Sequence, residues 1–169
     1  MRIIIGNICS LLAMLANAFS STRKTPKGML HIQNLGQTIY FTGAMALRGY
    51  SAGVQNIIGI LRNVMAIREW KSKILEWILV AAGVVFGILF NNRGFVGLLP
   101  IVANLEYTLV IFRFSTNERA LKLAFLISSV CYVVFNLAIS NYVGAVMDAI
   151  VLTTTAISLL SPKPKQPLS

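Results

Sequence analysis

The sequence contains very few acidic residues and almost no histidine. Of 169 residues, 5 are Asp or Glu and one is histidine, whereas 15 are Lys or Arg. Acid–base catalysts and metal sites draw on these scarce residue types, and no segment places a nucleophile beside a base or groups metal ligands at a suitable spacing. We therefore expect a protein that is not an enzyme and that binds no metal or other cofactor.

Cysteine and charge are also scarce. Cys9 and Cys131 lie in separate apolar segments without CxxC spacing, which argues against a disulfide framework and a zinc site. Charged residues make up 12% of the chain and hydrophobic residues 56%, and the mean hydropathy is +0.74. Soluble domains do not need so much apolar material, so the composition favours a membrane protein whose principal partner is lipid.

The formal net charge of +10 raises the question of nucleic-acid binding. A nucleic-acid-binding surface gathers its basic residues on one polar face. Here they are scattered between apolar segments instead. We therefore expect no nucleic-acid partner and interpret the charge as a signal of membrane topology.

Seven apolar segments are long enough to cross a bilayer. A hydrocarbon core of about 30 Å needs about 20 helical residues, and somewhat fewer where the ends snorkel. Short polar, basic or glycine-containing connections separate the segments. The sequence thus predicts an all-α membrane protein with seven transmembrane helices. They are 3–19, 29–47, 51–67, 74–90, 95–112, 121–139 and 142–160.

The distribution of Lys and Arg predicts the orientation. Eleven of them lie in the first, third and fifth connections and the C-terminal segment, and three lie at the N-terminus and in the second and fourth connections. Because short basic loops stay on the cytoplasmic side, we expect the N-terminus outside and the C-terminus in the cytoplasm. Residues 161–169 contain three prolines, which predicts a disordered cytoplasmic tail.

A shift of 92 residues aligns the chain with itself. It pairs Tyr40 with Tyr132 and Tyr50 with Tyr142, and 5 of the 21 residues from Thr38 to Ile58 are identical to their counterparts. The shift superposes the first three segments on the last three and leaves the fourth unmatched, which makes the two halves parallel. We expect two parallel three-helix bundles (1–70 and 94–160) joined by a linker helix (71–93).

Polar residues fall on one face of the six repeated segments when these are plotted as helices. The fourth segment has no polar side chain from Ile78 to Phe90. The polar stripes predict a substrate pathway, although small polar residues also serve close packing between helices. The predicted pathway residues are Gln37, Gln55, Asn56, Asn63, Asn104, Tyr132, Asn136 and Asp148.

Three charged residues lie well inside predicted membrane segments, where a charge costs about 2.5 kcal/mol or more. Arg62 and Glu106 each follow the outer start of their segment by eleven residues, so they share a depth of about 16 Å, and we predict a buried ion pair. The alternative is that Arg62 snorkels inward and Glu106 finds a backbone partner or a proton. Asp148 either binds a cationic solute or proton, or anchors two helices by a hydrogen bond.

Four short motifs lie in or beside the connections between the predicted helices: Arg23-Lys24-Thr25-Pro26-Lys27-Gly28, Leu47–Gly53, Gly59–Asn63 and Ile139–Gly144. With them, the chain resembles the YgjV family of bacterial inner membrane proteins, within the superfamily of SWEET, PQ-loop and PnuC transporters. The resemblance implies a cytoplasmic-membrane location and a transport activity. In SWEET-like members, paired polar residues in the third helix of each bundle line the substrate pocket, and they correspond to Asn56 and Asp148 here. Pro100 is the one proline inside a predicted segment, which puts a sugar-type hinge mechanism in doubt.

The sequence as a whole predicts a transporter that moves a small polar or cationic solute between the two bundles. Two other functions stay open: a channel or pore subunit, and a scaffold protein of the inner membrane that transports nothing. The identity of the solute or ion and the oligomeric state are open as well, and a homo-oligomer is among the alternatives.

Overall fold

The computed structural model describes residues 1–20, 23, 25–70, 72–114 and 118–160. The described chain contains seven helices and no strand, which confirms the all-helical prediction, and the helix ends differ from the predicted ones by at most three residues. The predicted tail, 161–169, lies outside the described residues. The helices are α1 (Arg2–Ser20), α2 (Pro26–Ala46), α3 (Tyr50–Ile67), α4 (Lys73–Leu89), α5 (Gly94–Phe114), α6 (Glu118–Ala138) and α7 (Tyr142–Leu160).

Within the described residues, two of the seven helices, α1 and α7, are both long and apolar enough to cross a membrane by length and composition alone. Shorter apolar segments lie in α5 (Gly94–Val110) and in α6 (Lys122–Ala138). The remaining helices carry more polar residues or, like α4 with 17 residues, are shorter. Apolarity thus supports two of the seven predicted spans directly.

The surface is rich in large apolar side chains. More than half of the surface of Ile4, Ile78 and Ile157 is exposed, and further exposed apolar residues lie on every helix. Soluble monomers rarely leave contiguous apolar surface of this extent in water. The distribution is the one expected of helices that face lipid.

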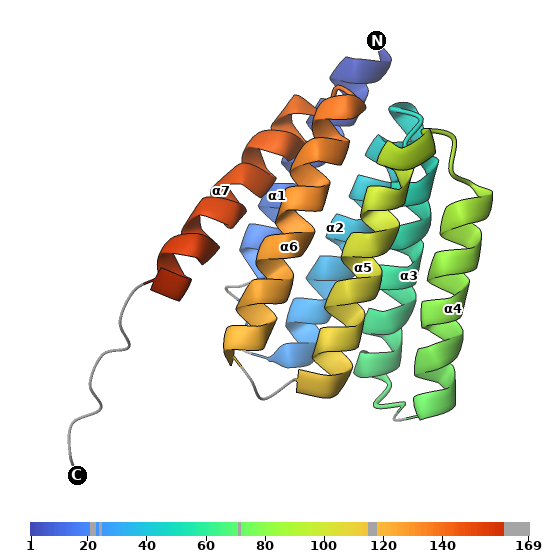
Figure 1. Ribbon diagram of the computed structural model, residues 1–169, viewed down its shortest axis with the longest axis vertical. Coiled ribbons are helices and arrows are strands. Elements are labelled where there is room, and N and C mark those ends of the chain that lie inside the picture. The colour runs from blue at the N-terminus through green and yellow to red at the C-terminus, as the bar shows by residue number, and fades with distance from the viewer. Residues whose placement is uncertain (21–22, 24, 71, 115–117, 161–169) are drawn as a thin grey trace.

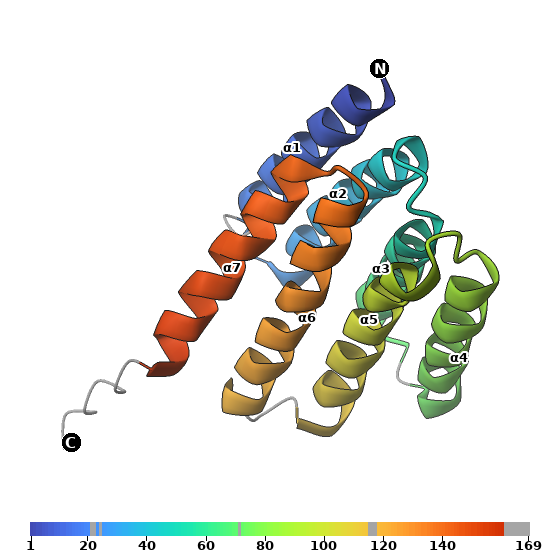
Figure 2. The same ribbon diagram turned by 45° about the horizontal axis from the view of Figure 1, so that its top comes forward.

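The helices form two rows that lie against each other (Figures 1 and 2). One row is α1, α2 and α3, and the other is α7, α6 and α5. At the edges of the rows α1 packs against α7 and α3 packs against α5, while α4 lies outside and packs against α3 and α5. For the described residues, α1 makes no contact with α3, nor α5 with α7. Six helices therefore form a closed ring with α4 outside it.

Short connections explain the rows. The α2–α3 and α6–α7 turns span only a few residues, so consecutive helices become antiparallel neighbours. Small residues bring α1 and α2 close together: a Cβ added to Gly43 would lie 2.9 Å from Cys9 Cβ, and one added to Gly6 would collide with Leu47. Such small-residue contacts are typical of helices that pack in membranes.

The apolar core lies at the end of the ring where α2 meets α3 and α6 meets α7. Its buried side chains come from both rows, and Val96 and Leu99 of α5 pack against them. Phe135, at 1% exposure, is the largest of them. The cluster thus fills the space between the two rows at this end. It consists of Ala44, Leu47, Ala52, Phe135 and Ile139.

The two turns at this end have the same backbone geometry. Arg48 and Ser140 have φ of 58° and 61°, respectively. The amide of the next residue donates to a carbonyl five residues earlier in each turn, Gly49 to Ala44 and Asn141 to Asn136, both at 2.8 Å. These are Schellman motifs, which normally place glycine at the left-handed position. The two turns are 92 residues apart.

The left-handed conformation leads to a stability prediction for Ser140. For a residue with a β-carbon this conformation raises the free energy of the folded state by about 1 kcal/mol, and for glycine it does not. Ser140→Gly is therefore expected to stabilise the purified protein by about 1 kcal/mol, seen as a higher unfolding midpoint in detergent. Ser140→Ala keeps the β-carbon and serves as the control. An equal midpoint for Ser140→Gly and Ser140→Ala would contradict the strain at this position.

Candidate functional site

A chain of polar side chains leads from the α6–α7 turn to Asp148. Asn136 Nδ2 donates to Asp148 Oδ2 at 2.7 Å, and Asn141 Nδ2 donates to Asn136 Oδ1 at 2.9 Å. Asn141 Oδ1 in turn accepts from the Gly144 amide at the start of α7, at 3.2 Å. The two asparagines therefore hold the Asp148 carboxylate in a fixed orientation.

Asp148 also lies near aromatic residues of both rows. Its charge acts on the phenol groups of Tyr40 in α2 and Tyr132 in α6. The Tyr132 phenol is at the same time within electrostatic range of Arg62 in α3. We call Asp148, Asn136, Tyr40 and Tyr132 the carboxylate cluster. It brings together three of the predicted pathway residues and adds Tyr40, and it lies between the two rows.

A second polar group joins α3, α4 and α5. Asn104 Nδ2 donates to Gln55 Oε1 at 2.6 Å, and Gln55 Nε2 donates to the Gly83 carbonyl at 2.9 Å. Gly87 of α4 makes this contact feasible, because a Cβ at that position would lie 2.8 Å from Gln55 Nε2. The fourth helix is therefore more than a linker: its backbone binds a buried side chain of α3.

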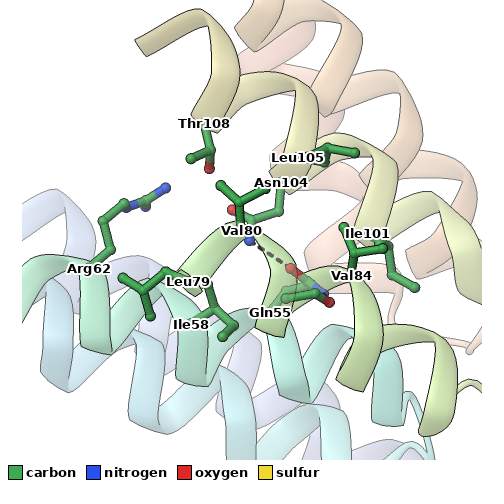
Figure 3. A pocket seen from close by; sticks show the side chains of 11 residues that line it. Gln55, Ile58, Arg62, Leu79, Val80, Val84, Ile101, Asn104, Leu105 and Thr108 are labelled. Atoms are coloured by element: carbon green, nitrogen blue, oxygen red, sulfur yellow. Dashed lines mark hydrogen bonds between the residues drawn. The ribbon is translucent and has the colours of Figure 1, made fainter. Parts of the chain in front are cut away.

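A small cavity lies beside this group, between the same three helices (Figure 3). Its volume is about 20 Å³, which is room for about one water molecule and far too little for a sugar. Most of its walls are apolar. Besides Gln55 and Asn104 its polar residues are Arg62 and Thr108, and its apolar residues are Ile58, Leu79, Val80, Gly83, Val84, Ile101 and Leu105.

The predicted ion pair between Arg62 and Glu106 is wrong. In the described parts of the chain, the ion pair that forms is instead the exposed one between Lys27 Nζ and Glu69 Oε1, at 2.8 Å. Glu106 Oε2 accepts a hydrogen bond from Ser128 Oγ of α6 at 3.3 Å. Equal depth does not place two residues on facing surfaces, because residues two positions apart differ by about 200° around a helix. Asn104 and Thr108 face the cavity, and Glu106 between them faces α6.

The other predicted pathway residues do not join either group. Asn63 is buried at 6% exposure. Asn56 is half-buried, and among the described side chains it has no hydrogen-bond partner, Asp148 included. Gln37 packs across α2 and α3, where a Cβ on Gly59 would lie 3.4 Å from its Cδ. Asn56 and Asp148, which the resemblance assigns to the lining of a substrate pocket, thus share no hydrogen bond, and their role as pocket residues stays a prediction.

Two side chains that the sequence did not single out as site residues join the rows. Asn7 Nδ2 of α1 donates to the Ser140 carbonyl at 2.9 Å, and Asn7 Oδ1 accepts from the Val143 amide at 2.9 Å. Arg93, just before α5, donates through Nη2 to the Leu47 carbonyl at 2.9 Å and through Nε to the Arg48 carbonyl at 3.3 Å. We call these two contacts the crossing ties. The one sequence signal that connects the two crossing ties is the 92-residue offset between Arg48 and Ser140, whose carbonyl groups accept these hydrogen bonds.

The crossing ties lead to a second stability prediction. Asn7→Ala leaves the Ser140 carbonyl and the Val143 amide without their partner, and an unsatisfied buried group costs about 1 to 3 kcal/mol. We expect a lower unfolding midpoint in detergent for Asn7→Ala and for Arg93→Gln. Asn92→Ala, at an exposed position beside Arg93, is the control and should leave the midpoint unchanged. Midpoints within error of the wild type for both tie variants would rule the ties out as stabilising contacts.

Comparison with known proteins identifies the family. Residues 4–162 match the model of the Imp-YgjV family, which is described as a bacterial inner membrane protein family. No curated protein and no solved structure matches the chain. The match covers almost the whole sequence and confirms the resemblance to YgjV proteins that the motifs indicated. The chain therefore belongs to the Imp-YgjV family of bacterial inner membrane proteins.

Proposed function

We propose that the protein is a small-solute transporter of the inner membrane, in which a polar or cationic solute passes between the two rows. The observation that carries the proposal is the carboxylate cluster. A carboxylate at the seventh residue of α7 lies about 9 Å from the start of that helix. Phenol groups from both rows lie within electrostatic range of it, which supports a role in contacting a solute that passes between the rows.

The energetics favour a functional role for Asp148 over a purely structural one. A carboxylate inside a membrane helix costs about 2.5 kcal/mol or more. An interhelical hydrogen bond stabilises the fold by about 0.6 to 2 kcal/mol. Asn136 is the one hydrogen-bond partner of Asp148 among the described residues. A cation or a proton at Asp148 offsets the remaining cost. Asn136 would then orient the carboxylate toward that ligand.

The arrangement of the helices supports a repeat of three helices, a linker and three helices. Apart from the contact of α3 with α4, each contact of α1, α2 and α3 has a counterpart: α1 with α2 matches α5 with α6, α2 with α3 matches α6 with α7, and α1 with α7 matches α5 with α3. The two turns 92 residues apart have the same hydrogen bonds. Parallel repeats about an axis normal to the membrane occur in several transporter folds. This likeness supports the relationship to SWEET, PQ-loop and PnuC proteins that the motifs implied.

One end of the ring is closed. The apolar core and both crossing ties lie at the end that contains the α2–α3 and α6–α7 turns. With the orientation that the basic residues favour, this is the outer end. The arrangement supports a carrier in a state closed to the outside, which reaches its other state when the rows separate at the ties.

Transport is tested with protein reconstituted into proteoliposomes. The probes are radiolabelled methylammonium, a small cation, and glycerol, a neutral polar solute. We expect saturable uptake of at least one probe, stimulated by unlabelled probe inside the vesicle. Asp148→Asn, which keeps the shape but removes the charge, should lower the rate of methylammonium uptake at least tenfold.

Glu76→Gln is the matched control, because it removes an acidic group from the first turn of α4, away from both polar groups. It should transport at the wild-type rate. A flux that rises linearly with concentration and shows no exchange would indicate a pore subunit and overturn the carrier proposal. Folded protein that transports neither probe, with Asp148→Asn indistinguishable from wild type, would favour the scaffold protein.

A further inference from the structure

Arg62 is a charged group without a counter-charge inside the helix ring. It is the thirteenth residue of α3 and is half-buried. Over the described residues its guanidinium forms no ion pair and donates no hydrogen bond. A guanidinium has five N–H donors and stays protonated, so a site this far inside the protein leaves several donors unsatisfied.

Among the described residues that line the cavity no carboxylate faces Arg62, and the other polar groups there are a hydroxyl and two amides, from Thr108, Gln55 and Asn104. Its guanidinium points from α3 toward Thr108 of α5 across the cavity (Figure 3). The phenol groups of Tyr107 and Tyr132 lie within electrostatic range. Thr108 is buried at 8% exposure, and its hydroxyl, unlike those of several other helical threonines in the described chain, does not donate to the preceding turn. One fixed positive charge among hydroxyl groups is the chemistry of an oxyanion site.

The walls of the cavity indicate what kind of molecule carries the oxyanion. Ile58, Leu79, Val80 and Leu105 surround the polar groups. Arg62 is five residues from Ile67 at the end of α3, or about 7.5 Å along the helix. Its long side chain can therefore meet a group that enters from the membrane interface. This favours an oxyanion attached to an apolar body over a fully hydrated one.

We propose that a phosphate or carboxylate group binds at the mouth of the cavity between α3, α4 and α5 and places one oxygen atom in its water-sized space, with the Arg62 guanidinium as the charge of the site and the Thr108 hydroxyl as a second donor. The Gln55–Asn104 hydrogen bond holds α3 and α5 at the spacing of the site. Tyr132 lies within electrostatic range of both this site and Asp148, but the cavity residues do not include the Asp148 carboxylate, and binding there does not require that the protein transports anything.

The test is a binding titration of the purified, delipidated full-length protein in neutral detergent, followed by native mass spectrometry. One arm uses dioleoylphosphatidylglycerol, and dioleoylglycerol is its uncharged counterpart with the same tails. A second arm measures the shift in unfolding midpoint with inorganic phosphate. We expect Arg62→Gln to weaken binding in at least one arm by tenfold or more and Arg62→Lys to weaken it less. If lipid binding in the first arm depends on Arg62, the ligand is a lipid headgroup. If the midpoint shift with phosphate in the second arm depends on Arg62, the ligand is a free oxyanion.

Two further variants make the result decisive. Arg68→Gln removes an exposed positive charge six residues beyond Arg62 and should leave the affinity within twofold of wild type. Thr108→Val keeps the size of the side chain and the charge of the site, and should weaken binding about threefold even if Arg62→Gln does not fold. Equal losses for Arg62→Gln and Arg68→Gln would reveal nonspecific surface attraction and overturn the proposal. Affinities that neither Arg62→Gln nor Thr108→Val changes would overturn it as well.

Discussion

The crossing ties are the constraint on which the arrangement of the two rows depends. A left-handed turn at a helix end leaves carbonyl groups without a helical partner, and in a low-dielectric environment each of these is costly. Asn7 supplies the donor for one turn and Arg93 for the other, each from the opposite row. Because both turns are held in this way, the apolar core can close between them and the polar groups below it acquire defined positions.

The helices could be predicted from sequence, and their arrangement could not. Apolar length and turn-forming or basic connections are local properties, so all seven helices and both tight turns follow from them. The closed ring depends on contacts such as Asn7 with Ser140, which lie 133 residues apart. A polar residue in an apolar segment indicates that it has a hydrogen-bond partner, but the sequence does not identify that partner. The contacts that close the six helices into a ring therefore could not be identified from the sequence.

The same distinction applies to the site residues. Asp148, Asn136 and Tyr132 could be chosen from sequence because polar groups in membrane segments are costly and need a reason. Gln55 and Asn104 were chosen on the same grounds, but the bond from Gln55 to the Gly83 carbonyl of α4 depends on Gly87 having no side chain. The predicted Arg62–Glu106 pair is wrong because equal depth in the membrane does not place two side chains on facing sides of α3 and α5. The helical periodicity of α5 indicates that Asn104 and Thr108 share a face and that Glu106 lies on another.

Contact between α1 and α7 has a consequence for biosynthesis. The first helix leaves the ribosome long before the last, so the seam between them is the final one to form. Until Tyr142 and the residues after it are in place, the amide of Asn7 has neither the Ser140 carbonyl nor the Val143 N–H in position. A nascent chain that stops short of α7 thus leaves Asn7 Oδ1 without its donor, while Asn7 Nδ2 keeps the Ile3 carbonyl of its own helix, so the seam between the first and the last helix closes only when synthesis is nearly complete.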